Sequence, residues 1–264
     1  MSKLRDELKT EREKMKGRPL KYKLEYFWEY YKFHAIGIIV GLLIVIYIVK
    51  TIVTAKDYAL FVVEINSGDA TGEVSETWKN ELTDFLGVDT KDYEVYIDSS
   101  MQFSFGNVSS QTDYTSAQKL TALLTARTMD IMMSDITVFE QYAQNRCFID
   151  LREIYTEEEL SAMEGRIYYT DAATYSDYDS SELNVYEIQS GYVIDHHDPS
   201  SMEDPIPVGI FADESTRVGQ SGVYDYLADT GDYQGHVNEA VIGIIASTER
   251  RDAAVMGLQY FLNE

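Results

Sequence analysis

One stretch of the sequence limits what this chain can fold into more than any other. From Ala35 to Val49 no residue is charged, and the apolar run continues to Ala55 with Lys50 as its only charged residue. About 21 residues of α-helix span roughly 31 Å, the thickness of a bilayer's hydrocarbon core. A helix that is apolar on every side favours lipid over the core of a soluble domain. We therefore expect a transmembrane helix over residues 34–55.

The position of this run favours a retained anchor over a cleaved signal peptide. Signal peptides carry a shorter apolar segment that starts closer to the N-terminus. The sole cysteine, Cys147, lies far beyond the run, so no lipid-attachment cysteine follows it. The bilayer is then the first expected partner of the chain.

The charges on the two sides of the run differ strongly, and this difference predicts orientation. Residues 1–33 hold ten Lys and Arg against six Asp and Glu, whereas residues 57–264 hold ten against 39, a net charge of −29. Basic flanks stay in the cytoplasm, and the aromatic and lysine residues of 20–34 suit the membrane interface. We expect a single-pass protein of the cell membrane, with residues 1–33 cytoplasmic and 56–264 extracytoplasmic. The acidic charge of that domain argues against a nucleic-acid partner.

The segment after the apolar run alternates strand and helix patterns. Alternation of this kind predicts an α/β domain with helices packed on a mostly parallel sheet. Thr156, Ser116, and either Ser247 or Thr248 are expected as helix N-caps. The expected strands are 57–66, 93–100, 130–135, 167–170, 184–195, 207–213 and 241–247, and the expected helices are 74–87, 117–126, 136–144, 156–163 and 247–262.

A family resemblance follows from the order of four pieces between Lys119 and Leu151. They are Lys119-Leu120-Thr121-Ala122-Leu123-Leu124, Met129-Asp130-Ile131-Met132-Met133, Tyr142-Ala143, and Ile149-Asp150-Leu151. This order resembles the signature region of extracellular solute-binding proteins of ABC importers. The strand YEVYIDSS fits the second strand of that family, and residues 207–264 match it loosely. The resemblance implies a type II periplasmic-binding-protein-like α/β domain.

The sequence departs from that family in two turns and in length. Arg127 to Asp130 replaces the usual Gly-Asp-x-Pro-Asp turn, and Arg146 replaces a turn glycine. Family members insert a second lobe between the halves of the first, and only residues 156–206 remain here to form one. The resemblance therefore implies a reduced second lobe.

Polar residues follow the first three expected strands and form the candidate ligand-binding wall. Open α/β sheets bind ligands beyond the carboxyl ends of their strands. Such side chains can hydrogen-bond a sugar or a peptide, and the acidic ones can hold a cation; alternatively, they serve as ordinary turn and cap residues. The candidates are Asn66, Ser67, Asp98, Ser99, Ser100, Ser134 and Asp135.

No pattern in the sequence predicts a metal site, a cofactor or a catalytic centre. His196 and His197 are adjacent, so on a strand they would point to opposite faces and could not share one ion. A calcium-loop pattern that starts at Asp177 has Glu182 and Ile188 at positions that require glycine and glutamate. Nucleophile and phosphate-binding motifs are absent, and Cys147 lies in a structural turn. We predict a non-enzyme with no cofactor and no metal.

Two functions remain open from the sequence. The first is a membrane-anchored, solute-binding-like protein that presents a small solute, a sugar or a peptide, to an ABC-type transporter or a membrane sensor. The alternative is an interaction or assembly subunit of a cell-envelope complex that keeps the fold without binding a ligand. The short middle segment and the two altered turns favour the alternative, whereas the ordered family resemblance favours solute binding.

Overall fold

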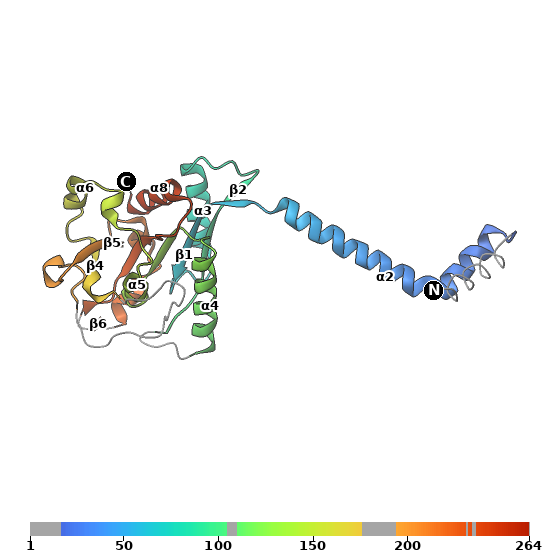
Figure 1. The fold of residues 1–264 in the computed structure, drawn as a ribbon, viewed down its shortest axis with the longest axis horizontal. Helices are drawn as coiled ribbons and strands as arrows, with labels where there is room; N and C mark the ends of the chain where they lie inside the picture. Colours follow the sequence, from blue (N-terminus) through green and yellow to red (C-terminus); the bar gives the residue numbers. More distant parts are fainter. Residues whose placement is uncertain (1–16, 105–109, 176–193, 231, 234–235, 264) are drawn as a thin grey trace. The chain divides into compact units, whose positions relative to one another are not determined.

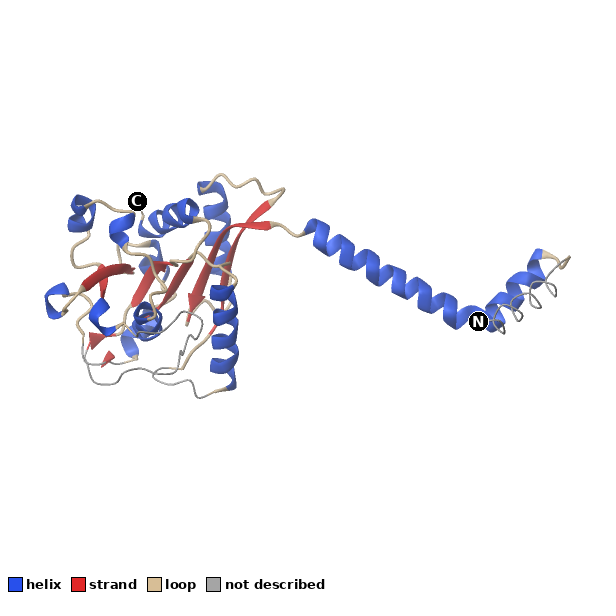
Figure 2. Cartoon of the chain, in the orientation of Figure 1, coloured by secondary structure: helices blue, strands red, loops and turns tan. Residues whose placement is uncertain are grey.

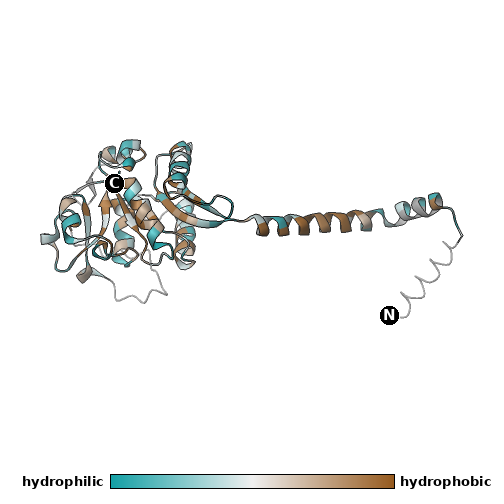
Figure 3. Ribbon diagram, turned by 90° about the horizontal axis from the view of Figure 1, so that it is seen from above, coloured by the Kyte–Doolittle hydropathy of each residue, from teal (hydrophilic) through white to brown (hydrophobic). Residues whose placement is uncertain are grey.

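The computed structural model describes residues 17–104, 110–175, 194–230, 232–233 and 236–263 (Figure 1). The chain divides into two compact units, residues 1–55 and residues 56–264. The polypeptide between Pro19 and Ala55 is one helix, α2 (Leu20–Thr54). Its segment Tyr31–Thr51 is long and apolar enough to cross a membrane, a property that anchors share with signal sequences. The brown stretch of the helix in Figure 3 marks this apolar segment.

Helix α2 also carries part of the expected interfacial aromatic group. The side chains of Trp28, Tyr31 and Phe33 are exposed along it. The other expected members are Tyr22, Tyr26, Phe27 and Tyr30, whose side chains lie outside the described part of the chain. The assignment of residues 1–33 to the cytoplasm and of 56–264 to the outside stays a prediction.

The second unit is built on a six-stranded sheet with helices on both faces (Figure 2). Neighbouring strands follow the order β2-β1-β3-β8-β5-β4. Strands β2, β1 and β3 are parallel, whereas β8 runs antiparallel to β3 and β5, and β4 runs antiparallel to β5. The strands are β1 (Asp57–Ile65), β2 (Tyr93–Met101), β3 (Ile131–Asp135), β4 (Ile167–Asp171), β5 (Pro205–Phe211) and β8 (Ala240–Ile244), and a separate ribbon pairs β6 (Asp232–Tyr233) with β7 (His236–Val237).

The apolar run of β1 explains why this strand lies inside the sheet. Strands covered by helices on both faces need apolar residues at successive positions. Leu60 and Val62 face one buried cluster, which contains residues of α3 (Glu73–Phe85) and α8 (Arg251–Leu262). Phe61 and Val63 face the other cluster, which contains residues of α4 (Gln111–Thr125) and α5 (Ile136–Gln144). The domain therefore has two core layers that share one sheet.

The expected mixed α/β architecture is confirmed, and the expected strand–helix alternation holds through α5. The mostly parallel sheet is wrong, because β8 returns from the C-terminal region and enters antiparallel between β3 and β5. Of the expected strand 184–195, the described residues Ile194 and Asp195 are not in a strand, and the remainder lies outside the described residues. Two short helices, α6 (Glu157–Ala162) and α7 (Arg217–Ser221), complete the unit.

Two of the three expected helix caps are wrong. Thr156 caps α6 as expected. Helix α4 begins earlier than expected, because Ser110 and Asp113 form a reciprocal capping box. Ser116 therefore lies inside the helix, where its hydroxyl accepts a hydrogen bond from the Gln102 N–H. The N-cap of α8 is Arg250, which makes no side-chain cap bond.

The two turns that depart from the family pattern have the backbone conformation of glycine. Arg127 has a φ of 53° and Arg146 a φ of 57°, both in the left-handed region that glycine enters without steric cost. The turn geometry is thus present although the residue that usually supplies it is not. Each turn ends a helix and leads back into the sheet layer.

Candidate functional site

The carboxyl ends of β1, β2 and β3 lie along one edge of the sheet, where the sequence places the candidate ligand-binding wall. Asn66, directly after β1, is buried and has a φ of 55°. Its side-chain nitrogen donates to Asp135 Oδ2 at 2.6 Å, and its Oδ1 accepts from the Phe103 N–H at 2.6 Å. Both ends of this amide are therefore used within the domain. It ties the end of β1 to the end of β3.

Asp135 and Ser134, at the end of β3, serve the start of α5. The Oδ1 atom of Asp135 accepts from the backbone N–H groups of Thr137 and Val138 and from the Thr137 hydroxyl. Ser134 is fully buried and donates to the carbonyl of Asp135. These bonds make Asp135 a helix N-cap.

Asp98 is paired inside the domain as well. Its side chain is 4% exposed, and its Oδ2 lies 2.5 Å from the ammonium of Lys119 on α4. Burial opposes ionisation of this carboxyl, but hydrogen bonds from Lys119 and Ser100 outweigh burial and lower its pKa. The Ser100 hydroxyl bonds both Asp98 and Lys119. Ser99 is half-buried beside this cluster.

A later segment of the chain, residues 222–230, covers the carboxyl end of β1. The Tyr224 hydroxyl donates to the Ile65 carbonyl at 3.0 Å, and the Tyr226 hydroxyl donates to the Asn66 carbonyl. Gly68 donates its N–H to Val223 at 2.7 Å, an approach so close that a Cβ there would lie 2.8 Å from the carbonyl. Burial raises the pKa of both tyrosines, so both remain neutral donors. We name residues 222–230 the tyrosine cover, in which Tyr224 is buried.

Glu64 is an ionisable residue at this edge that sequence reasoning missed. It lies among the apolar residues of β1 and is fully buried. One carboxyl oxygen accepts from the Ser75 hydroxyl at 3.3 Å, and the other has no hydrogen-bond partner. Burial raises the pKa of Glu64 to about 7, although Ser67 and Ser75 oppose the shift. The sequence signal that could have identified Glu64 is a single acidic residue among the successive apolar residues of β1.

One part of the candidate wall remains open to solvent. A hollow of about 470 Å³ lies between the turn after β1 and the end of β2, and it is lined by Ser67, Gly68, Asp69, Ala70, Tyr96, Ile97, Asp98, Ser99, Ser100 and Gln102. Four candidates, Ser67, Asp98, Ser99 and Ser100, thus lie together. The other three, Asn66, Ser134 and Asp135, are buried, and Tyr226 of the tyrosine cover bonds the Asn66 carbonyl.

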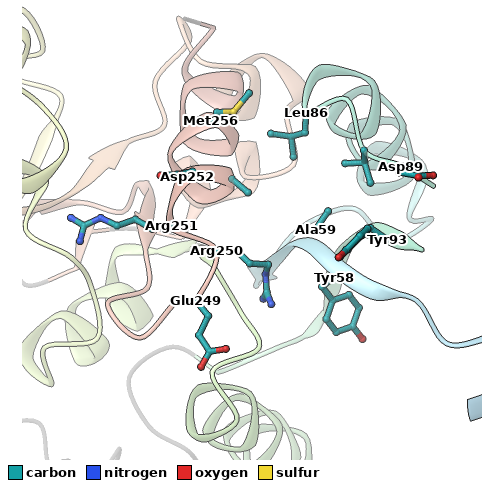
Figure 4. A pocket seen from close by; sticks show the side chains of 12 residues that line it. Tyr58, Ala59, Leu86, Asp89, Tyr93, Glu249, Arg250, Arg251, Asp252 and Met256 are labelled. Carbon is teal, nitrogen blue, oxygen red and sulfur yellow. The ribbon is translucent and has the colours of Figure 1, made fainter. Parts of the chain in front are cut away.

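The opposite edge of the sheet has a groove of about 580 Å³ (Figure 4). In this view Met256 lies beside Leu86, and Arg250 lies beside the start of β1, which carries Tyr58 and Ala59. The guanidinium of Arg250 is already paired within the domain, so it is not available to bind a ligand in the groove. Its Nε lies 2.9 Å from the fully buried Asp130, and its terminal nitrogen donates to the Thr128 carbonyl.

The adjacent histidines have separate partners, so they do not form one ion site. His196 is buried, stacks on Tyr168 and bonds the Tyr169 carbonyl through Nδ1 at 2.7 Å. His197 Nε2 lies 2.8 Å from Glu239, and this hydrogen bond raises the pKa of His197. His196 therefore lies in the protein interior, whereas the His197 side chain is 37% exposed.

No described group of three His, Cys, Asp or Glu side chains is placed to hold a metal ion. The calcium-loop pattern at 177–188 lies outside the described residues. Burial raises the pKa of Cys147 to about 12, so its thiol is protonated at neutral pH and is a poor nucleophile. The predictions of no metal, no cofactor and no catalysis stay predictions.

Comparisons with known proteins add a distant structural similarity. No family model matches the chain, and no curated protein matches it. The chain is similar to a solved structure of the ABC substrate-binding protein Lmo0181 from Listeria monocytogenes in complex with cycloalternan, with 10% sequence identity and a TM-score of 0.29. The match covers 60% of this chain and 29% of that one, so the chain spans less than a third of that protein's length. A similarity this distant identifies neither a family nor a ligand for this chain.

Proposed function

We propose that this chain is a non-catalytic interaction or assembly subunit of a cell-envelope complex, with residues 56–264 as its interaction domain and α2 as its membrane anchor. One observation carries the proposal: the buried side chains of Asn66, Asp98 and Asp135 at the carboxyl edge of the sheet are hydrogen-bonded within the domain. A ligand-binding wall requires donors and acceptors that are free to contact the ligand. Asn66, Asp98 and Asp135 are instead engaged by Phe103, Lys119 and the first turn of α5.

The energetic reason is the cost of breaking these bonds. A ligand that displaced the Asn66–Asp135 bond would have to replace it fully, because a buried polar group left unpaired costs about 1–3 kcal/mol. The tyrosine cover would also have to move away from Ile65 and Asn66, whose carbonyls it caps. Closure of this edge favours a structural role for these residues.

A reduced second lobe is part of the proposal. Within the described part of 156–206, β4 extends the same sheet, and α6 belongs to the same compact unit. A domain with a single lobe has no opposed surface that could close over a solute. Anchoring by a helix would instead hold the domain at high effective concentration near a membrane partner.

The test is crosslinking of the full chain in intact membranes without added solute. We expect one stoichiometric protein partner to co-purify. The control is a chain with residues 1–55 retained and an unrelated soluble domain in place of 56–264, which should recover no such partner. Recovery of the partner only after a solute is added, or equal recovery with the control chain, would contradict the proposal.

A second function is favoured by the hollow next to Ser67 and Ser99. Its volume of about 470 Å³ suits a monosaccharide or a dipeptide, and the Ser99 side chain makes no hydrogen bond among the described residues. In this function the domain presents the solute to an ABC-type transporter or a membrane sensor. Thermal unfolding of the full chain with a sugar, peptide and amino-acid library separates the two functions. A shift that Ser99→Val abolishes supports solute binding, whereas no shift with any compound supports the interaction function.

A further inference from the structure

The groove of about 580 Å³ at the amino edge of the sheet is lined mostly by apolar side chains (Figure 4). Leu86 and Val88 come from the segment between α3 and β2, and Met256 comes from α8. Met256 is 39% exposed, and Tyr93, at the start of β2, is 46% exposed. Apolar side chains that gather in this way around an open groove mark interaction surfaces, whereas single exposed ones do not.

Three carboxylates accompany this apolar surface. In Figure 4 Asp89 lies on one side of it, and Asp252 and Glu249 lie on the other. All three residues are exposed, and none forms an ion pair with a residue that the structure describes. The Asp89 side chain accepts one hydrogen bond, from the Lys91 N–H at 3.0 Å. The apolar centre of the groove therefore lies between negative charges.

The two cationic side chains of the groove are paired with other carboxylates. Arg250 Nε lies 2.9 Å from the buried Asp130, and Arg251 lies 2.7 Å from Glu153. Neither arginine is thus engaged with the carboxylates that flank the apolar surface. A partner that complements this groove carries apolar side chains with positive charges on both sides of them.

The lining of the groove favours a helical partner over an extended one. An extended peptide binds by adding a strand to an open sheet edge, through its backbone groups. The groove is lined by side chains of α8 and of the segment after α3, and the nearby edge strand β2 is closed at Val95, which is 1% exposed. An amphipathic helix instead lays its apolar face into a groove lined by side chains.

We propose that this groove binds a cationic amphipathic helix of a partner protein. The apolar face of that helix packs against Leu86 and Met256, and its lysine or arginine side chains meet Asp89 on one side and Asp252 and Glu249 on the other. The groove is then a contact surface of the interaction function proposed above, and its assignment rests on that function. A second copy of this chain is a poor occupant, because two domains with a net charge of −29 each repel one another.

The first experiment titrates defined peptides into the full chain in phosphatidylcholine nanodiscs, with empty nanodiscs as the blank. The probe is a blocked helix of leucine and lysine, roughly 15 residues long, with all leucines on one face. One comparison peptide has the same composition in an order that removes the apolar face, and another has glutamate in place of lysine. We expect the probe to bind at least tenfold more tightly than either. Equal binding of the reordered peptide or of the glutamate peptide would overturn the proposal.

Matched variants locate the binding in the groove. Met256→Gln keeps the length of the side chain but makes it polar, and Asp89→Asn removes a charge; each should weaken binding of the probe at least threefold. Asp84→Asn is the charge control, because Asp84 is an exposed carboxylate of α3 that does not line the groove. Tyr114→Ser, at an exposed ring on α4, is the control for Met256→Gln. Equal losses in the controls, or no loss in the two groove variants, would overturn the site. Circular dichroism verifies that each variant is folded.

Crosslinking of the full chain in intact membranes separates the groove from the interaction function itself. The native chain is compared with a groove chain that carries Asp89→Asn and Met256→Gln and with a control chain that carries Asp84→Asn and Tyr114→Ser. Loss of the partner from the groove chain alone supports the proposal. Equal recovery by all three chains overturns it and leaves the interaction function standing.

Two further outcomes of the crosslinking are decisive. A crosslinked species that contains two copies of this chain, and that the groove chain does not form, assigns the groove to a second copy and overturns the proposal. Recovery of no partner by the native chain contradicts the interaction function, and the peptide titration then decides the groove alone.

Discussion

The two ends of the central sheet are closed by different chemistry. At the amino end of β3, the buried carboxylate of Asp130 accepts from the Phe61 N–H at 2.7 Å and from Arg250 Nε at 2.9 Å. At the carboxyl end, the amide of Asn66 and the hydroxyls of Tyr224 and Tyr226 cap backbone and carboxylate groups. Around β1 and β3, the amino end therefore depends on an ion pair with a buried carboxylate and the carboxyl end on a spread of mostly neutral hydrogen bonds, while the Asp98–Lys119 pair lies on β2. A single substitution should damage the first end far more than the second.

The largest expected effect is at the amino end. Asp130→Ala leaves the Arg250 guanidinium without its partner and the Phe61 N–H without its acceptor. Removing one member of a buried ion pair costs about 3–5 kcal/mol, so we expect the free energy of unfolding to fall by that amount. Denaturant unfolding of the full chain, followed by Trp78 fluorescence in a Trp28→Phe background, measures it. Asp150→Ala removes the more exposed Asp150–Arg152 pair and should cost less than about 1 kcal/mol; equal losses would remove the contrast between the two ends.

A pH effect is expected next, from Glu64 near the carboxyl end. Its pKa rises from 4.5 to about 7 on folding, so the folded chain binds the proton more tightly than the unfolded chain. The contribution of Glu64 to stability is complete below pH 4.5 and is lost as pH rises to 7. The loss is about 3 kcal/mol at 1.36 kcal/mol per pKa unit.

Glu64→Gln should remove this pH dependence and leave the chain more stable than the native sequence at pH 8. Unfolding free energies at pH 4.5, 6 and 8 measure the difference between the two chains. Glu158→Gln, on the exposed face of α6, is the control and should leave the pH profile unchanged. A constant difference between Glu64→Gln and the native chain across this range would contradict the raised pKa.

A smaller effect is expected from the tyrosine cover. Tyr224→Phe keeps the ring but leaves the Ile65 carbonyl without its donor, which should lower the free energy of unfolding by about 1–2 kcal/mol. Tyr93→Phe, at a half-exposed ring on β2, should change it by less than about 0.5 kcal/mol. A Tyr224→Phe loss as large as that of Asp130→Ala would show that the carboxyl end also depends on one contact.

The smallest expected effect concerns the turn before β3. Arg127 holds a φ of 53°, so Arg127→Gly should relieve strain and stabilise the domain by about 0.5–1 kcal/mol. The neighbouring Ala126 has a φ of −77°, where glycine brings only extra freedom in the unfolded chain, so Ala126→Gly should destabilise by a similar amount. Denaturation midpoints of both variants test the opposite signs. Stabilisation by both would mean that the effect does not come from the backbone conformation.

The local pattern of the sequence predicts most of the helices and strands, but it does not predict how strands that are distant in the chain pair. Successive apolar residues in β1 and the 3.6-residue period of α3 arise from neighbours along the chain, so they are readable. Strand β8 was expected as a strand, but its antiparallel place beside β3 depends on a pairing between distant segments. No local signal in the sequence specifies that pairing.

The sequence indicates where the candidate residues lie, but it does not indicate which groups they hydrogen-bond. Asn66 and Asp135 lie at strand ends as expected, because polar residues end buried strands, whereas Asp98 lies within β2, three residues before its end. These three side chains bond Phe103, Lys119 and the first turn of α5, and Tyr224 bonds Ile65 although more than 150 residues separate the two. Contacts between segments so far apart in the chain leave no local signal in the sequence. Glu64 was missed because a carboxylic acid that burial keeps protonated up to about pH 7 resembles an ordinary charged residue in a sequence.

The central position of β8 has a consequence for biosynthesis. Ile242 pairs with Met133 on one side and Ile210 on the other, so the strand that joins the two halves of the sheet is synthesised after both β3 and β5. At synthesis rates of about 5–20 residues per second, β3 waits several seconds with an unpaired edge. Nascent chains that stop before residue 240 would expose two open edges, which are templates for aggregation. The domain thus depends on rapid completion of β8, or on a factor that shields the edge of β3 until β8 arrives.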